Sequence, residues 1–193
     1  LDGSELNTPK ERKKWNLRSK FRIIPRDFVK LNNGKVVMEI EEVGIGSDTL
    51  SFDEYVELRL MSLIIKITSA TPCYKSIFKF MKSYNVTIFD LVFSMLKNTH
   101  IASDNLQKFF EEFRQYTIDE LWDSGEELIQ HYQNPHEYEK LLNGSAGQNV
   151  AFYFHAIAIS EQMSDFTDFC IKTAKKLIEK NTDEDFSTEL NAI

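Results

Sequence analysis

Two histidines and two glutamates come closest to a constellation that could hold a metal ion. His131 and His136 follow Glu126 and Glu127 in the sequence, and the four-residue spacing of Glu127 and His131 would place both side chains on one face of a helix. A di-iron site in a helical bundle needs a Glu-x-x-His pattern on each of two helices, and this sequence contains none. The spacing therefore favours surface histidines, and no metal-ligating residue is predicted.

His155 and the two cysteines are the other residues that could do chemistry. His155 lies in the apolar run VAFYFHAIAI, where it could shuttle a proton or, as we expect, serve as a hydrogen-bonded core histidine. Cys73 and Cys170 show no CxxC spacing, so we expect two small core hydrophobes in a reducing cytoplasm. There is no GxSxG motif and no glycine-rich phosphate loop. The sequence predicts no catalytic residue in this chain.

The beginning of the chain is basic. Ten of the 23 Lys and Arg residues, but only four of the 30 Asp and Glu residues, lie within the first 35 positions. These cations alternate with Trp15, Phe21 and Phe28, and cations together with aromatic rings can hold single-stranded RNA. The net charge of −7 argues against a dedicated nucleic-acid binder. We therefore expect a charged segment that packs its aromatic rings on its own protein, with nucleic acid an improbable partner.

The composition is that of a chain with a sizeable core. Among 193 residues 42% are hydrophobic, and 15 are phenylalanine. The longest nearly apolar run, residues 58–67, contains Arg59 and Lys66 and is too short to cross a bilayer. No secretion signal is visible at the start of the sequence. We expect a cytoplasmic location and no membrane partner.

Before Ser51 the pattern predicts a small β-hairpin. Residues 21–24 and 28–31 are two short extended segments separated by Pro25, which lacks a backbone N–H. Asn32, Asn33 and Gly34 tolerate the positive φ angles of a tight turn. Residues 35–45 alternate in polarity and form the returning strand.

After Ser51 the pattern is helical. Ser51 with Glu54, and Thr117 with Glu120, have the Ser/Thr-x-x-Glu form of a capping box, and Thr87 with Asp90 is a further start signal. The helix at 150–159 is apolar on almost every side, which predicts that its neighbours enclose it, whereas the last helix has one apolar face. The helices are expected at residues 51–70, 74–83, 88–97, 103–116, 117–132, 135–142, 150–159 and 166–178.

These elements define a mainly α fold, an irregular helical bundle preceded by a small β-hairpin. Residues 1–50 form a basic joint, residues 51–180 a helical domain, and residues 181–193 an acidic flexible tail.

The run DGSELNTPKERKKWNLRSKFRIIPRDF, the hairpin, and the stretch SDTLSFDEYVELRLM resemble a region of the radical SAM proteins that carry a B12-binding domain. In that family a Gly-Ser/Thr-Glu turn follows a late barrel strand, an Asn-(Ser/Thr)-Pro step begins a helix, and a stretch like FRIIPRDF leads into C-terminal helices. The resemblance covers residues 2–62. It implies that the chain, which opens on Leu1 in place of methionine, is a C-terminal fragment beginning just after a barrel strand.

The resemblance implies cofactors and partners that lie outside this chain. The family holds a 4Fe-4S cluster on a Cys-x-x-x-Cys-x-x-Cys loop and uses S-adenosylmethionine and cobalamin, and this chain has neither the loop nor a cobalamin domain. The implied partners are an upstream barrel and cobalamin domain in the same polypeptide, which would act on an unknown substrate, for example as a methyltransferase. Arg22 and Arg26 would bind an anionic group or a barrel carboxylate. The isolated fragment, non-catalytic alone, could dimerise through the surface that the barrel would cover.

The alternative from the residues themselves is a free-standing helical interaction module whose basic head binds RNA or an acidic protein. Such binding would weaken steeply with salt. A self-contained helical hydrolase or metalloenzyme is a third possibility, but it needs a cluster of ligands or catalytic residues that the sequence does not show.

Overall fold

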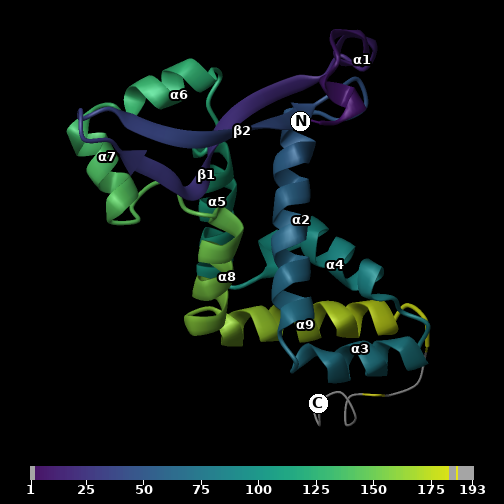
Figure 1. The fold of residues 1–193 in the computed structure, drawn as a ribbon. Coiled ribbons are helices and arrows are strands. Elements are labelled where there is room, and N and C mark those ends of the chain that lie inside the picture. Colours follow the sequence, from purple (N-terminus) through teal and green to yellow (C-terminus); the bar gives the residue numbers. More distant parts are fainter. Residues whose placement is uncertain (1–2, 183–185, 187–193) are drawn as a thin grey trace. The chain divides into compact units, whose positions relative to one another are not determined.

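The computed structural model describes residues 3–182 and 186. These residues form a mainly helical fold with an N-terminal two-stranded hairpin, as the sequence predicts (Figure 1). In chain order the elements are η1 (Glu5–Asn7), α1 (Pro9–Lys14), β1 (Arg18–Lys30), β2 (Val36–Gly46), α2 (Phe52–Ala70), α3 (Tyr74–Ser83), α4 (Ile88–Lys97), η2 (Thr99–Ile101), α5 (Asp104–Asp119), α6 (Gly125–His131), α7 (Pro135–Leu142), α8 (Val150–Ser160) and α9 (Met163–Ile178).

The chain forms two compact units, and each unit is built from two segments. The hairpin unit contains the residues up to Val56 together with Gln115–Val150, and the helical unit contains Glu57–Arg114 together with the described residues from Ala151 onward. The sequence-based division near residue 51 follows chain order, whereas the hairpin unit also takes in α6 and α7 from much later in the chain.

The hairpin is a single antiparallel pair, β1 with β2, whose register shifts between Ile23 and Phe28. The sequence predicts two short segments there, and the structure instead has one strand with a bulge. Arg26 sits in the bulge with a φ of 71°, because the extra residues around Pro25 must be accommodated opposite β2. At the predicted turn, the Leu31 N–H donates to the Lys35 carbonyl at 2.9 Å and Gly34 has a φ of 84°.

The core of the hairpin unit lies where α6 and α7 cover one face of the hairpin (Figure 1). The first four residues of β2 alternate between buried and exposed, so that Val36 and Met38 point toward the helices while Val37 and Glu39 do not. Gly125, the first residue of α6, lies so close to the hairpin that a Cβ there would meet the Ile40 side chain at 2.6 Å. The buried members of this cluster are Ile23, Val36, Met38, Leu128, Tyr132, Tyr138 and Leu141.

The expected helix start at Thr117 is wrong. Helix α5 continues through Thr117 to Asp119, and Thr117 is fully buried rather than placed at a cap. The chain then leaves the helix because Trp122 pairs with Phe21 as an isolated bridge, with N···O distances of 2.8 and 2.7 Å. The next helix starts at Gly125, where the Ser124 hydroxyl accepts from the Glu127 N–H. A tertiary contact with the hairpin therefore outweighs the local capping signal.

Other predicted helix ends are confirmed. The Ser51 and Glu54 side chains each accept from the other residue's backbone N–H, at 3.1 and 2.8 Å. Thr87 and Asp90 form a second capping box at the start of α4. Pro135 begins α7, and the helix ends before Gly144, which has a φ of 76°.

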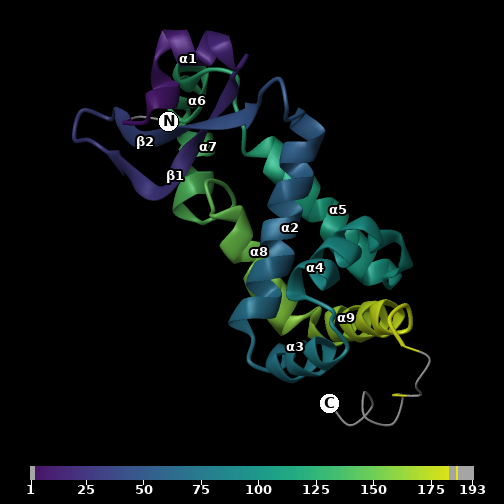
Figure 2. The same ribbon diagram turned by 90° about the vertical axis from the view of Figure 1, so that its right-hand side faces the viewer.

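The helical unit has a core rich in phenylalanine. Helix α9 lies beside α3 and α4 in both views (Figures 1 and 2), and its predicted apolar face is confirmed. Phe154 of α8 contacts the rings of Phe109 and Phe113 of α5, each with a centroid distance of 5.3 Å. The buried residues of α9 are Phe166, Phe169, Cys170, Thr173, Ala174 and Ile178.

The expected acidic tail at 181–193 falls largely outside the described residues. Of its described members, Asn181 donates from its amide to the Tyr84 carbonyl at 3.2 Å. Phe186 is buried and its ring lies near Phe80 and Tyr84 of α3. Residues 183–185 and 187–193 lie outside the described part.

Candidate functional site

Arg22, one of the two expected anion-binding residues, lies on β1 between two carboxylates of its own chain. Its Nε donates to Glu41 of β2 at 2.6 Å and its Nη1 donates to Glu120, just after α5, at 2.8 Å. Burial acts to lower the pKa of Arg22, but the charge of Glu120 and hydrogen bonds to both carboxylates raise it above its ordinary value. The guanidinium therefore ties the hairpin to the end of α5, and an external anion would have to displace these partners.

Arg26, the second expected residue, lies apart from this network. It occupies the bulge of β1 and its side chain is exposed. Among the described residues its side chain has no hydrogen-bonding or ion-pair partner. The structure therefore does not bring Arg22 and Arg26 together as one anion site, although Arg26 alone offers an exposed cation.

Several other cations of the basic head are also paired within the hairpin unit. Arg12 of α1 donates to both oxygens of Glu42 on β2, at 2.7 and 2.5 Å. This hydrogen bond from Arg12 and a further one from Ser19 lower the pKa of Glu42. Lys20 pairs with Asp123. The strands and the segment after α5 thus carry acidic residues opposite the basic ones, and much of the head's charge is balanced locally.

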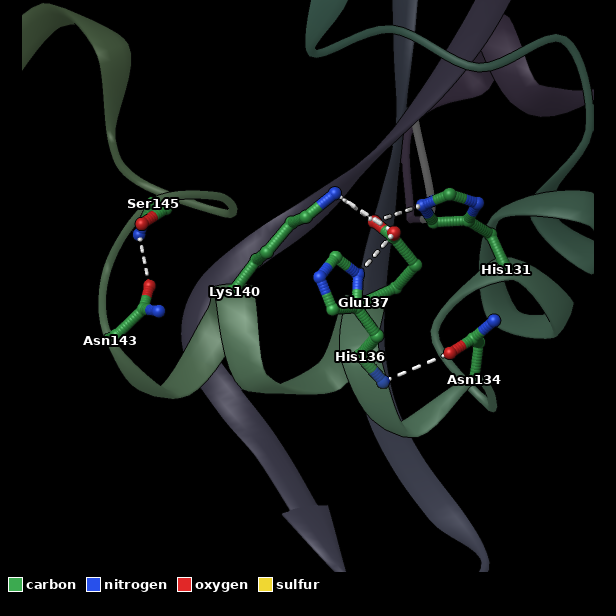
Figure 3. Close-up of polar contacts among 7 residues, drawn as sticks. All are labelled: His131, Asn134, His136, Glu137, Lys140, Asn143 and Ser145. Atoms are coloured by element: carbon green, nitrogen blue, oxygen red, sulfur yellow. Dashed lines mark hydrogen bonds and ion pairs between the residues drawn. The ribbon is translucent and has the colours of Figure 1, made fainter.

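A cluster of polar side chains on α6 and α7 converges on Glu137 (Figure 3). His131 Nε2 lies 3.1 Å from one carboxylate oxygen, and His136 Nδ1 lies 3.2 Å from the other. Lys140 Nζ donates to both oxygens at 2.8 Å. Asn134 caps α7 by accepting from the His136 N–H at 2.9 Å. One carboxylate therefore holds three side chains from two consecutive helices.

The contacts of this cluster stabilise the structure and do not provide a catalytic base. The hydrogen bond from Lys140, followed by that from His136, lowers the pKa of Glu137 to about 2, so the carboxylate is too weak a base to take a proton near neutral pH. The His131 ring also contacts the rings of Trp122, in a tilted arrangement, and Tyr132, edge to face, at centroid distances of 4.9 and 4.8 Å. Sequence reasoning found both histidines but missed Glu137. The available signal was its position beside His136 and three residues before Lys140.

The remaining residues that could do chemistry are His155, Cys73 and Cys170. His155 has a buried Nε2 with no hydrogen-bond partner among the described residues, so the expected hydrogen bond is not made at this nitrogen. Burial and the charge of Lys66 lower its pKa. Cys170 is buried, which raises its pKa to about 12, but Cys73 is exposed and is not the core residue expected. Within the described chain no three His, Cys, Asp or Glu residues are arranged to hold a metal ion.

Helix α8 presents an apolar surface that the sequence did not predict. Only one side of the helix is enclosed: Phe154 and Ala158 are buried, whereas Phe152 is 62% exposed and Ile159 is 45% exposed. The expectation of a fully enclosed helix is therefore wrong, because the described neighbours cover only one side. Lys66 of α2 lies over the Phe152 ring, with its Nζ 3.4 Å from the centroid.

Helix α2 carries exposed apolar residues as well. Leu58 and Ile65, seven residues apart on that helix, are 49% and 43% exposed, and this spacing places them on one side of α2. We call Leu58, Ile65, Phe152 and Ile159 the α2/α8 apolar residues.

Comparison of the sequence with protein-family models, with curated proteins and with solved structures gave no match. No helix formed by the described residues has the length and apolar character needed to cross a membrane.

Proposed function

We propose that this chain is the C-terminal accessory domain of a cobalamin-dependent radical SAM enzyme such as a methyltransferase. In this proposal the chain does not catalyse the reaction. It packs on the barrel of the enzyme and helps to form the surface that a substrate or partner contacts.

The observation that carries the proposal is the exposure of α8. A helix that is apolar on all sides is typical of a protein interior, yet Phe152 and Ile159 of this helix are largely exposed. Exposed apolar residues of this size, with Leu58 and Ile65 on α2, favour a surface that packs against another protein body. An accessory domain would have such a surface where it contacts its barrel.

The pairing of the basic head supports the same proposal. Carboxylates of the hairpin unit form ion pairs with Arg12, Lys20 and Arg22. These ion pairs stabilise the segment that resembles the radical SAM proteins. This arrangement favours a structural joint over an RNA-binding surface, which would need cations free to contact phosphates. Arg26 is one of the exposed cations of the head and is available to a barrel carboxylate.

The parent enzyme's 4Fe-4S cluster, S-adenosylmethionine and cobalamin would be held outside this chain. The family's cluster needs three closely spaced cysteines, and the chain has only Cys73 and Cys170. Because Cys73 is exposed and Cys170 is buried, these two residues do not fit the cluster.

The proposal is tested by binding in trans. The polypeptide encoded upstream of this chain is produced separately and its affinity for the chain is measured by isothermal titration calorimetry. We expect a specific complex that Phe152→Asp weakens by about tenfold or more, because a charge would be buried at the contact. Phe89→Asp is the matched control, since Phe89 is 61% exposed on α4, away from the α2/α8 apolar residues in sequence and element.

Two results would count against the proposal. One is the absence of a Cys-x-x-x-Cys-x-x-Cys loop from the upstream polypeptide. The other is an affinity that Phe152→Asp and Phe89→Asp change equally. A salt-sensitive complex of the chain with single-stranded RNA, lost on Lys13→Ala, would favour the interaction module instead.

A further inference from the structure

A cavity of about 340 Å³ lies in the helical unit between the last turns of α4 and α9. Its volume is at the lower end of the range for small-molecule pockets, roughly 300–1,000 Å³. Ile101 of η2 and Leu177 of α9 supply apolar wall. Lys172 donates to the Ile101 carbonyl at 3.5 Å, so that η2 is held against α9 beside the cavity.

Polar groups line the α4 side of this cavity. Ser94 and Asn98 lie one turn apart, and the Asn98 amide nitrogen donates to the Ser94 carbonyl at 2.8 Å and to its hydroxyl oxygen at 3.5 Å. These contacts fix the amide group. The Asn98 side-chain oxygen keeps its accepting capacity, and the Ser94 hydroxyl, which accepts from Asn98, keeps its proton for donation. A ligand in the cavity would therefore meet both a donor and an acceptor.

Cations line the α9 side. Lys176, in the last turn of α9, and Lys180, two residues after the end of the helix, both border the cavity. Glu179 also borders the cavity, but among the described residues neither lysine has a carboxylate within ion-pair distance. Two cations and one anion thus give this wall a net positive charge in a chain whose net charge is −7.

We propose that the α4/α9 cavity binds a small organic anion, a phosphate ester or a carboxylate with a short apolar or hydroxylated body. The anionic group lies between Lys176 and Lys180, which act as point charges toward it. The body contacts Ile101 and Leu177, and a ligand hydroxyl exchanges hydrogen bonds with Ser94 and Asn98. This site does not depend on the proposed accessory role of the chain.

The test is an NMR titration of the full ¹⁵N-labelled chain with glycerol 3-phosphate and, in a second arm, with succinate. We expect saturable shifts at the Ser94 and Asn98 amides with at least one of the two probes, and none with uncharged glycerol. The probe that binds more tightly identifies the preferred anionic group as a phosphate or a carboxylate. Lys176→Gln and Lys180→Gln should each weaken binding roughly tenfold, as expected for loss of a charge-assisted hydrogen bond.

The matched control is Lys175→Gln, which removes a lysine of α9 that does not line the cavity and should leave affinity unchanged. Lysines near a helix C-terminus also stabilise that helix end without any ligand. The proposal is overturned if neither probe gives saturable shifts. It is also overturned if Lys175→Gln weakens binding as much as Lys176→Gln, since the effect would then reflect general charge.

Discussion

The two units of this chain are stabilised in different ways. The hairpin unit has a small apolar core between hairpin and helices, framed by charged contacts such as Arg22 with Glu41 and Glu120. The helical unit relies on aromatic packing, in which Phe154 contacts Phe109 and Phe113. A two-stranded hairpin buries only one of its faces against other elements. Polar contacts with segments far away in the sequence therefore help to determine which elements the hairpin packs against. Long helices can bury aromatic rings directly.

This difference bears on function. In the hairpin unit several of the charges that could recognise a partner, those of Arg12, Lys20 and Arg22, are paired with carboxylates of the same chain. In the helical unit some large apolar residues lie outside the described core, and the α2/α8 apolar residues are among those that remain exposed. Recognition of a partner is therefore expected to rest on apolar surface more than on the basic head.

Phe154→Ala should have the largest effect. Phe154 is almost fully buried among aromatic rings, and its truncation should lower the free energy of unfolding by about 3–5 kcal/mol. Phe152→Ala, two residues away on the same helix but exposed, should cost less than about 1 kcal/mol. Urea denaturation followed by circular dichroism measures both, and equal losses would contradict the assigned faces of α8.

Arg22→Ala should come next. It leaves the Glu41 and Glu120 carboxylates without their shared cation, and because the site is partly exposed we expect a loss of about 1–3 kcal/mol. Arg26→Ala removes an exposed cation of the same strand and should cost less than about 0.5 kcal/mol. Thermal unfolding in low and high salt separates the two variants. A loss on Arg26→Ala that matches the loss on Arg22→Ala would contradict the network.

Arg26→Gly should act in the opposite direction. Arg26 has a φ of 71°, a conformation that costs a non-glycine residue about 1–2 kcal/mol. Glycine avoids this cost, but it loses more conformational entropy on folding, which offsets part of the gain. We expect a gain of roughly 0.5 kcal/mol. Asp27→Gly, at the neighbouring exposed position, should instead be neutral or destabilising. The melting temperatures of both variants are measured by calorimetry. A melting temperature of Arg26→Gly below that of the unaltered chain would show that the bulge needs the arginine side chain.

The smallest effect concerns pH. The pKa of Glu137 is lowered to about 2, so its contribution to stability is complete above the ordinary carboxyl pKa of about 4.3 and is lost as the pH falls toward 2. Carbon-detected NMR of the carboxyl group should show this low pKa. Lys140→Met should raise it toward the ordinary value, whereas Lys35→Met in the hairpin turn should not. A pKa of Glu137 near 4.3 in the unaltered chain would contradict the contacts described for this cluster.

The sequence predicted the elements whose ends are set locally. The capping boxes at Ser51 and Thr87, Pro135 at the start of α7 and the turn at Gly34 are all decided by residues within four positions of one another. The failures depend on tertiary contacts. Thr117 carries a valid capping pattern but is buried within α5, because the chain turns only where Trp122 meets Phe21.

The candidate site was less predictable than the fold. Arg22 was expected to bind an anionic group or a barrel carboxylate, whereas its carboxylate partners in the structure, Glu41 and Glu120, come from distant segments of the same chain. The exposed side of α8 could not be predicted because an apolar helix gives no sign of which side its neighbours leave uncovered.

The most direct test of the accessory role is to isolate the polypeptide that carries this sequence from its source cells. A polyclonal antibody raised against the whole chain can capture it, and its mass, iron and acid-labile sulfide are then measured. The proposed role predicts a polypeptide well above the 22.5 kDa of this chain, with about four iron and four sulfide per molecule. An iron-free polypeptide of 22.5 kDa would contradict it.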